Sequence, residues 1–303
     1  MMKICKLSPI FFAVVFLASI QRLNAQSKTD QAKLKTASGL EYQIYNHKEG
    51  EKPKQGEFVK FQLAYTIGAN DSLLHSSFTN IPDYIPVDTG KQAQYSFMEV
   101  IPEMCAGDSA YITVSVDSLV NRKMIPAYNE VFQEGSSIKC KVKLLKILPS
   151  DSAVNADYAK ETELEKNREI KNIENYLTNA GIKAEKTKSG AYVVIENPGD
   201  TTLKADSGKV ASIKYKGYLF NGNVFDTNMD STKGHTEPIT VPVGAGRVIK
   251  GWDEALPYFG KGSKGKIFVP ALLAYGPQPM GSEIPAYSNL IFNIEMVDVT
   301  TTP

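Results

Sequence analysis

The side chains that most often carry enzyme chemistry are sparse in this chain of 303 residues. Its three histidines are scattered, and each is interpreted as a surface residue. Cys105 and Cys140 are isolated from them, so the pattern does not predict a metal site. Gly244 and Gly246 lack the further glycines and the Lys-Ser/Thr pair of a phosphate-binding loop. We therefore expect chemistry that needs no metal ion and no cofactor.

Aromatic residues of the second half are better candidates for a site. Trp252 is the only tryptophan of the chain and follows a glycine-containing loop. Phe225 and Asp226 come soon after Asn221-Gly222, a strong signal for a tight hairpin turn. For each residue alone a simpler interpretation stays open, because aromatic residues are usually buried in the core and aspartate often caps a turn.

Taken in order, several segments between Lys186 and Val299 resemble the FKBP-type peptidyl-prolyl cis/trans isomerases. A single segment would be weak support, whereas the ordered set is specific. The resemblance is carried by an opening hairpin, a loop with a central helix, a strand and three shorter segments, at residues 215–227, 243–256, 262–270, 274–276, 284–285 and 290–292.

The reaction of this family fits a site without nucleophiles. Rotation about an amide bond has a barrier of about 18–20 kcal/mol, because twisting breaks the C–N resonance. Only X–Pro bonds populate the cis form substantially, and they exchange over tens to hundreds of seconds. An apolar cleft favours the less polar, twisted amide, and a few placed donors then hold it.

The resemblance implies a role for each matched residue. Trp252 would form the floor beneath the prolyl ring. The Ile249 N–H and the Tyr275 hydroxyl would donate hydrogen bonds to carbonyls of the bound peptide. Asp226 would lie at the rim, where it orients Tyr215 or meets the twisted carbonyl. The walls of the pocket would be formed by Tyr215, Phe225, Val248, Ile249 and Phe292.

Three further residues are expected to contact substrate. Ile284 lies in a flap loop with Pro285. Ile239 and Val241 stand where the family commonly has aromatic residues. This departure predicts a lower activity or a changed preference for the residue before proline.

The elements that must position these residues are mostly strands. Alternating or short apolar runs predict strands over Val210–Phe220, Lys264–Val269 and Leu290–Val297. One short helix is expected over Trp252–Tyr258. The fold class is therefore α+β, an antiparallel sheet wrapped around a short helix.

The sequence also repeats itself. Ser38-Gly39-Leu40 parallels Ser189-Gly190-Ala191, and the segment 125–128 recurs as 284–287. We predict two FKBP-like domains, a degenerate one over residues 34–149 and an isomerase domain over 185–300.

Most of the implied pocket is missing from the first copy. Tyr65 is placed where Tyr215 stands, and Leu74-His75 near Phe225-Asp226. Phe97 falls at the place of Trp252 and Cys140 near that of Phe292, and no tyrosine corresponds to Tyr275. This domain is not expected to isomerise; binding of polypeptide, pairing with another copy and a spacing role stay open.

Residues 150–184 are expected to be a helical linker. The segment Asn155–Ala180 has no glycine or proline, and Gly181 follows as a C-terminal stop. Leu164, Ile170, Ile173 and Leu177 form an irregular apolar stripe. The helix is interpreted as a spacer resting on a neighbouring domain, with a homodimer through this helix as the alternative.

Residues 1–25 have the pattern of a secretory signal peptide. Lys3 and Lys6 precede an apolar run from Leu7 to Ile20, and small residues before Gln26 offer a cleavage site. The run is short for a membrane span. We expect export, to a bacterial periplasm or the medium, and no membrane span after cleavage.

The net charge of +1 and the absence of a basic stripe exclude an evident nucleic-acid binder. The expected function is assistance to the folding of proline-containing polypeptide clients by an exported isomerase. The alternative is a non-catalytic polypeptide-binding chaperone on the same scaffold.

Overall fold

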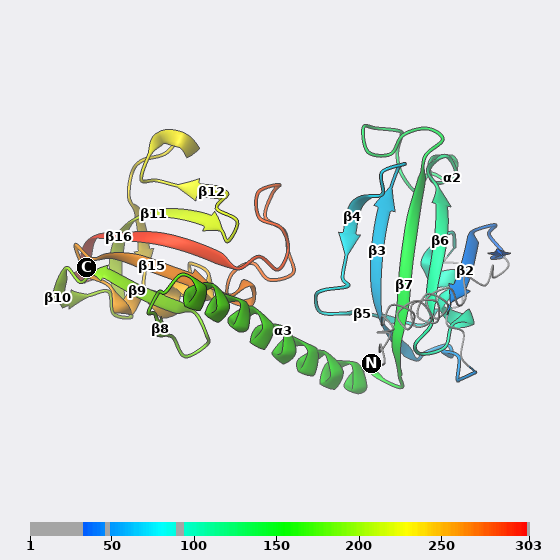
Figure 1. Cartoon of the computed structure of the whole chain (residues 1–303), viewed down its shortest axis with the longest axis horizontal. Helices are drawn as coiled ribbons and strands as arrows, with labels where there is room; N and C mark the ends of the chain where they lie inside the picture. Colours follow the sequence, from blue (N-terminus) through cyan, green and yellow to red (C-terminus); the bar gives the residue numbers. More distant parts are fainter. Residues whose placement is uncertain (1–32, 46–48, 89–93, 302–303) are drawn as a thin grey trace, which may run out of the picture. The chain divides into compact units, whose positions relative to one another are not determined.

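The computed structural model describes residues 33–45, 49–88 and 94–301, so the segment interpreted as a signal peptide lies outside the described residues. The chain divides into an N-terminal domain that ends at Asp151 and a C-terminal domain that begins at Ser152 (Figure 1). Among the described residues, no helix is both long enough and apolar enough to cross a membrane.

The N-terminal domain is an antiparallel sheet. Its strand order is β1-β2-β6-β7-β3-β4, and β5 pairs with β3. The 3₁₀ helices η2 (Phe97–Glu99) and η3 (Ile101–Glu103) and the helix α2 (Val116–Asn121) complete it. The strands are β1 (Leu34–Lys35), β2 (Glu41–Tyr45), β3 (Phe58–Ile67), β4 (Ser72–Ser76), β5 (Asp83–Pro86), β6 (Ser109–Ser115) and β7 (Ser137–Leu148).

The C-terminal domain repeats this topology. Its order is β8-β9-β15-β16-β11-β12, and β13 pairs with β11, while β10 and β14 form a separate two-stranded sheet. The predicted duplication and the α+β class are thereby confirmed. The strands are β8 (Glu185–Lys186), β9 (Tyr192–Asn197), β10 (Asp200–Lys204), β11 (Lys209–Leu219), β12 (Val224–Thr227), β13 (Ile239–Pro242), β14 (Gly260–Lys261), β15 (Lys264–Val269) and β16 (Leu290–Thr301).

Strand alternation places the core of the C-terminal domain on one face of the sheet. Ile213 and Tyr215 of β11 and Phe292 and Ile294 of β16 are buried on this face. The short helix α4 (Lys250–Ala255) and the 3₁₀ helix η5 (Leu256–Tyr258) contribute further core residues, Trp252 among them. The domain also contains the 3₁₀ helices η4 (Ser231–Lys233) and η6 (Ala271–Leu273).

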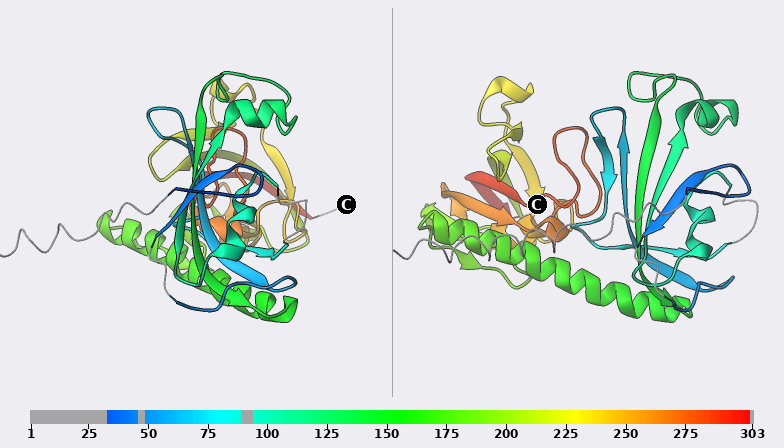
Figure 2. Two further views of the ribbon diagram at one scale, coloured as in Figure 1. Left: turned by 90° about the vertical axis from the view of Figure 1, so that its right-hand side faces the viewer. Right: turned by 45° about the vertical axis from the view of Figure 1, so that its right-hand side comes forward.

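Helix α3 (Asp151–Asn179) is longer than predicted and packs on the C-terminal sheet (Figure 2). Ile170, Ile173 and Leu177 are buried, whereas Leu164 is 63% exposed and lies outside the contact. The helix ends in a Schellman motif: Gly181 is left-handed, and the Ile182 N–H donates to the Leu177 carbonyl at 2.9 Å.

The outer face of the C-terminal sheet explains why a helix covers it. Tyr192, Phe268, Ile291 and Tyr218 form one row across β9, β15, β16 and β11. These side chains pack with α3 in one apolar cluster. The equivalent row of the N-terminal sheet is polar, and its members are Glu41, Thr113, Lys139 and Thr66. That row offers no apolar surface for a helix to bury.

The two cysteines of the described residues are buried and free, so no disulfide joins them. The Cys105 thiol donates a hydrogen bond to the Gly50 carbonyl at 3.3 Å. Cys140 lies on the central strand β7.

Candidate functional site

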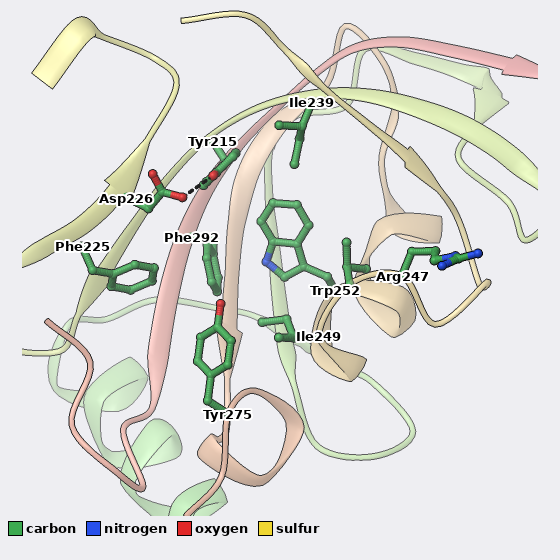
Figure 3. Close-up of a pocket in the computed structure, with 10 residues that line it drawn as sticks. Tyr215, Phe225, Asp226, Ile239, Arg247, Ile249, Trp252, Tyr275 and Phe292 are labelled. Atoms are coloured by element: carbon green, nitrogen blue, oxygen red, sulfur yellow. Dashed lines mark hydrogen bonds between the residues drawn. The ribbon is translucent and has the colours of Figure 1, made fainter. Parts of the chain in front are cut away.

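A cavity of about 320 Å3 opens on the inner face of the C-terminal sheet (Figure 3). Five of its lining residues belong to strands and one to α4, and loops supply the rest. All eight residues predicted to be catalytic line it, together with Ile239. The lining residues are Tyr215, Phe225, Asp226, Ile239, Arg247, Val248, Ile249, Trp252, Tyr275 and Phe292.

The aromatic rings of the cavity meet edge to face. The ring centroids of Trp252 and Phe292 are 5.1 Å apart, and those of Trp252 and Tyr215 are 5.4 Å apart. Phe225 packs on Phe292 at 5.7 Å. Each pair is close to perpendicular, the arrangement that ring quadrupoles favour. The floor and walls are therefore fixed by contacts among the aromatic side chains themselves.

Space for the Phe225 ring depends on Gly217. This residue pairs with Phe292 on one side and with Asp226 on the other. A Cβ atom at Gly217 would lie 2.6 Å from the Phe225 ring and 2.9 Å from the Phe292 ring. The missing side chain lets both rings reach the cavity.

The loop before α4 is held by Asp253 in the first turn of that helix. Its carboxylate accepts the Gly244 N–H at 3.1 Å and the Gly246 N–H at 2.8 Å. Both glycines are left-handed, with φ of 74° and 66°. The loop thus brings Val248 and Ile249 to the cavity beside Trp252.

Asp226 is the charged group of the cavity wall on the strand side. The Tyr215 hydroxyl donates a hydrogen bond to its Oδ2, and His235 Nε2 lies 3.0 Å from Oδ1. Burial alone would raise the pKa of Asp226, but the hydrogen bonds from Tyr215 and His235 outweigh it and lower this pKa. Burial, reinforced by the hydrogen bond to Asp226, raises the pKa of Tyr215. The pair therefore stays a phenol hydrogen-bonded to a carboxylate at neutral pH.

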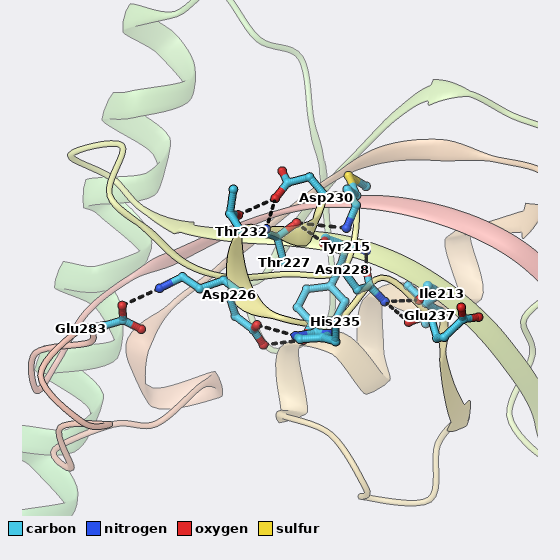
Figure 4. A network of polar contacts seen from close by, with 12 residues as sticks. Ile213, Tyr215, Asp226, Thr227, Asn228, Asp230, Thr232, His235, Glu237 and Glu283 are labelled. Carbon is cyan, nitrogen blue, oxygen red and sulfur yellow. Dashed lines mark hydrogen bonds and ion pairs between the residues drawn. The ribbon is translucent and has the colours of Figure 1, made fainter.

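Asn228 ties the segment after β12 to β11 (Figure 4). Its Oδ1 accepts the Tyr215 N–H at 2.6 Å, and its Nδ2 donates to the carbonyls of Ile213 and Glu237 at 3.1 and 2.9 Å. The Asn228 side chain is fully buried. These bonds set the path of the loop that carries His235.

Besides the buried indole Nε1 of Trp252, two donors at the cavity are not used within the described part of the chain. No described residue accepts a hydrogen bond from the Ile249 N–H or from the Tyr275 hydroxyl. Burial and the nearby Asp226 charge raise the pKa of Tyr275, so its hydroxyl remains protonated. Both donors are therefore available to carbonyl groups of a bound peptide.

Comparison with known proteins identifies this arrangement. Residues 201–297 match the family model described as FKBP-type peptidyl-prolyl cis-trans isomerase. The chain is 38% identical over 102 residues to FK506-binding protein 2 of Dictyostelium discoideum, which covers 34% of this chain and 74% of that protein. It is 38% identical over 96 residues to an FK506-binding protein of Neisseria meningitidis, covering 32% and 84% respectively. The chain belongs to the FKBP family of peptidyl-prolyl cis-trans isomerases.

Solved FKBP structures are also similar. The structure of the three FKBP domains of wheat FKBP73 covers 88% of this chain and 97% of that chain, at 17% identity and a TM-score of 0.35. The structure of AtFKBP13 covers 38% of this chain and 98% of that chain, at 31% identity and a TM-score of 0.34.

Two residues predicted to contact substrate do not line the cavity of this FKBP domain. Val241 follows Ile239 on the same face of β13, but it is buried in the hydrophobic core. Ile284 is also buried, in an isolated bridge with Met280. Both apolar side chains pack in the core cluster that also contains Trp252 and Phe292, and their contact with substrate stays a prediction.

Arg247 and His235 are site residues that the sequence analysis missed. Arg247 lines the cavity, and its position immediately before Val248 was the available signal. His235 is nine residues from Asp226, and no spacing rule links the two. Among the described residues, no group of three metal-ligating side chains exists that could hold an ion.

The N-terminal FKBP-like domain has a different set of residues at the equivalent positions. Sheet register places Leu63, not Tyr65, at the position of Tyr215, because Leu63 pairs with Val142 as Tyr215 pairs with Ile294. The predicted match of Tyr65 to Tyr215 was wrong by two residues.

The other matches in that domain agree with the register. Cys140 takes the place of Phe292, and His75 the place of Asp226. Phe97 precedes an Ile-Pro 3₁₀ turn as Trp252 precedes a Leu-Pro turn. Together with Leu63 in place of Tyr215, these matches replace four of the aromatic or acidic groups of the C-terminal cavity.

Proposed function

We propose that the C-terminal cavity is the catalytic site at which this enzyme accelerates cis/trans exchange of X–Pro bonds in polypeptide clients. The observation that carries the proposal is the aromatic cavity around Trp252, with two unused donors at its surface. A prolyl ring fits an apolar floor, and removal of the amide from water favours its twisted state.

Each role in the proposed catalysis is assigned to particular residues of the cavity. Trp252, Phe225 and Phe292 enclose the prolyl ring. The Ile249 N–H and the Tyr275 hydroxyl donate to carbonyls of the client. Tyr215 holds Asp226 at the rim, where the carboxylate faces the rotating amide. No proton transfer, metal ion or cofactor is needed, because no bond is broken.

The expected compartment follows from the N-terminal segment. Its basic start, apolar run and small-residue site support export. A folding catalyst that needs no ATP suits a periplasm or the medium. A homodimer through α3 stays the alternative to a spacer; burial of Ile170, Ile173 and Leu177 on the C-terminal sheet favours the spacer, and analytical ultracentrifugation of the mature chain would test it.

The catalytic proposal is tested with the full chain and a short X–Pro peptide. Uncatalysed exchange takes about 10–100 s at 25 °C, so catalysis is readily resolved. We expect a rate well above this background, a loss of at least about tenfold in Trp252→Ala and a smaller loss in Tyr275→Phe. Tyr258→Phe, a tyrosine of η5 outside the cavity, is the matched control.

A second candidate is a non-catalytic chaperone that binds polypeptide. The replaced cavity residues of the N-terminal domain favour it. Suppressed aggregation of an unfolded client, with exchange at the background rate by folded protein, would support this function and reject catalysis.

A further inference from the structure

Helix α3 contacts the turn that leads to Tyr275 through one buried carboxylate. Glu169 of α3 is only 2% exposed, and its Oε2 accepts the Leu272 N–H of η6 at 2.9 Å. The backbone carbonyl of Glu169 accepts a hydrogen bond from Asn289 Nδ2 at 3.2 Å. Asn289 in turn accepts the Ala271 N–H at 3.0 Å. A single residue of the helix is therefore bonded to both the 3₁₀ turn and the residue that precedes β16.

The segment held in this way carries a cavity residue. Tyr275 comes three residues after Leu272, and the turn between them is closed by hydrogen bonds. The Gly276 and Ala274 N–H groups both donate to the Ala271 carbonyl, at 2.8 and 2.9 Å. Because the turn is closed on itself, a shift of Leu272 displaces Tyr275 with it.

Glu169 lies in a setting that is costly for a carboxylate. Its Oε1 is buried and has no hydrogen-bond partner in the part of the chain that the structure describes. Burial raises the pKa of Glu169 to about 7; the Glu165 charge adds to the rise, while the Leu272 N–H and Arg168 oppose it. The charged groups that face it, Glu165 and Arg168, both belong to α3. Within the described ranges, two neutral groups bond Glu169 from outside α3: the Leu272 N–H of η6 donates to its carboxylate, and Asn289, just before β16, donates to its backbone carbonyl.

We propose that Glu169 is a positioning residue of the isomerase site, which holds the turn carrying Tyr275 against helix α3. The residue lies outside the segment 201–297 that the family model matches, so membership of the family does not assign it this role. The inference rests on the proposed function of the cavity. Under this proposal, α3 helps to position a residue of the catalytic site and is not only a linker.

The test uses the full chain with Glu169→Gln, Glu169→Ala and the matched control Glu174→Gln. Glu174 is another α3 carboxylate bonded to the domain, but it contacts Tyr192 and Lys186 on the side of β8 and β9. Three quantities are measured from pH 5.5 to 8.5: kcat/KM for an X–Pro peptide, the Kd of that peptide from Trp252 fluorescence, and the amide ¹⁵N shift of Leu272.

We expect Glu169→Ala to lower kcat/KM by about three- to tenfold, because small displacements of positioning groups are costly. Glu169→Gln, which keeps the acceptor, restores most of the activity, and Glu174→Gln behaves as the wild type. The Leu272 shift titrates near pH 7 in the wild type and in Glu174→Gln but not in Glu169→Gln.

Wild-type activity and peptide affinity in a folded Glu169→Ala would overturn the inference. Equal losses in Glu169→Ala and Glu174→Gln would also overturn it, since they would indicate general loosening of α3. An inactive wild type would reject the proposed catalysis instead. In that case weaker peptide binding by Glu169→Ala would still support positioning, and unchanged binding would reject it.

Discussion

Tyr65 of the N-terminal domain and Gly217 of the C-terminal domain occupy the same position in two sheets of equal topology. Each follows the β-bulge of its strand by the same number of residues, Tyr65 after the bulge at Lys60/Phe61 and Gly217 after that at Ser212/Ile213. Tyr65 pairs with Cys140, whereas Gly217 pairs with Phe292.

The two domains differ in which side chains fill the space at this strand position. In the C-terminal sheet the missing side chain leaves room for two rings that line the cavity. In the N-terminal sheet the ring belongs to Tyr65 itself, and it packs beside Phe97 with centroids 6.5 Å apart. The residue differences in the first copy therefore include this strand position as well as the missing tryptophan.

We predict that Gly217→Ala damages the C-terminal site. The new Cβ would force the rings of Phe225 and Phe292 to move, and overpacking of this kind costs about 1–3 kcal/mol. We expect a loss of unfolding free energy in that range, measured in urea by Trp252 fluorescence, and a decrease in kcat/KM of at least about tenfold. Ser212→Ala, on the opposite face of the same strand, is the control. Unchanged activity in Gly217→Ala would contradict this account.

Much of the fold could be predicted because strand alternation and turn residues are local signals. The strand Lys264–Val269 has the predicted bounds, and the predicted hairpin turn lies between β11 and β12. Trp252 could be singled out because it is unique in the chain and follows a loop that needs glycine. These features depend on neighbouring residues alone.

The parts that failed depend on pairing between distant segments. A two-residue shift of register keeps every side chain on its face, so alternation could not distinguish Leu63 from Tyr65 as the match to Tyr215. His235 meets Asp226 only through a loop whose path Asn228 determines. Val241 is buried in the core, whereas Ile239 on the same strand lines the cavity, and strand alternation does not distinguish the two.

The Asp226 carboxylate should stabilise the C-terminal domain except in acid. The pKa of Asp226 in the folded state lies below the ordinary value of about 3.9. The ionised carboxylate therefore adds to the free energy of unfolding above about pH 3.9, and this stabilisation is lost as the pH falls through the folded-state pKa. We expect wild type to have a higher melting temperature than Asp226→Asn at pH 6, and the two to converge towards pH 2. Trp252 fluorescence measures both transitions. A constant difference across this range would show that Asp226 acts by packing alone.

Cys140 should be unreactive in the native protein. Burial raises the pKa of its thiol to about 12, and the opposing hydrogen bond with Tyr65 is the smaller effect. Because the thiolate is the nucleophile, we expect iodoacetamide at pH 8 to leave Cys140 unlabelled until urea is added. Peptide mapping by mass spectrometry distinguishes it from Cys105. Rapid labelling in buffer would mean that the N-terminal core opens readily.

The stability of the C-terminal domain should fall as pH rises towards neutrality, because of Glu169. The folded-state pKa of about 7 is above the ordinary value of about 4.5, so the protonated form is favoured by folding. The stabilisation that the protonated Glu169 gives the folded state is complete below about pH 4.5 and is lost as the pH rises to about 7. We expect Glu169→Gln to gain about 2 kcal/mol relative to wild type between pH 5 and pH 8, as measured in urea by Trp252 fluorescence. Glu174→Gln should not gain with rising pH, because hydrogen bonds from Tyr192 and Lys186 lower the pKa of Glu174. A parallel pH dependence in wild type and Glu169→Gln would show that this carboxylate is solvated in solution and does not carry the cost of burial.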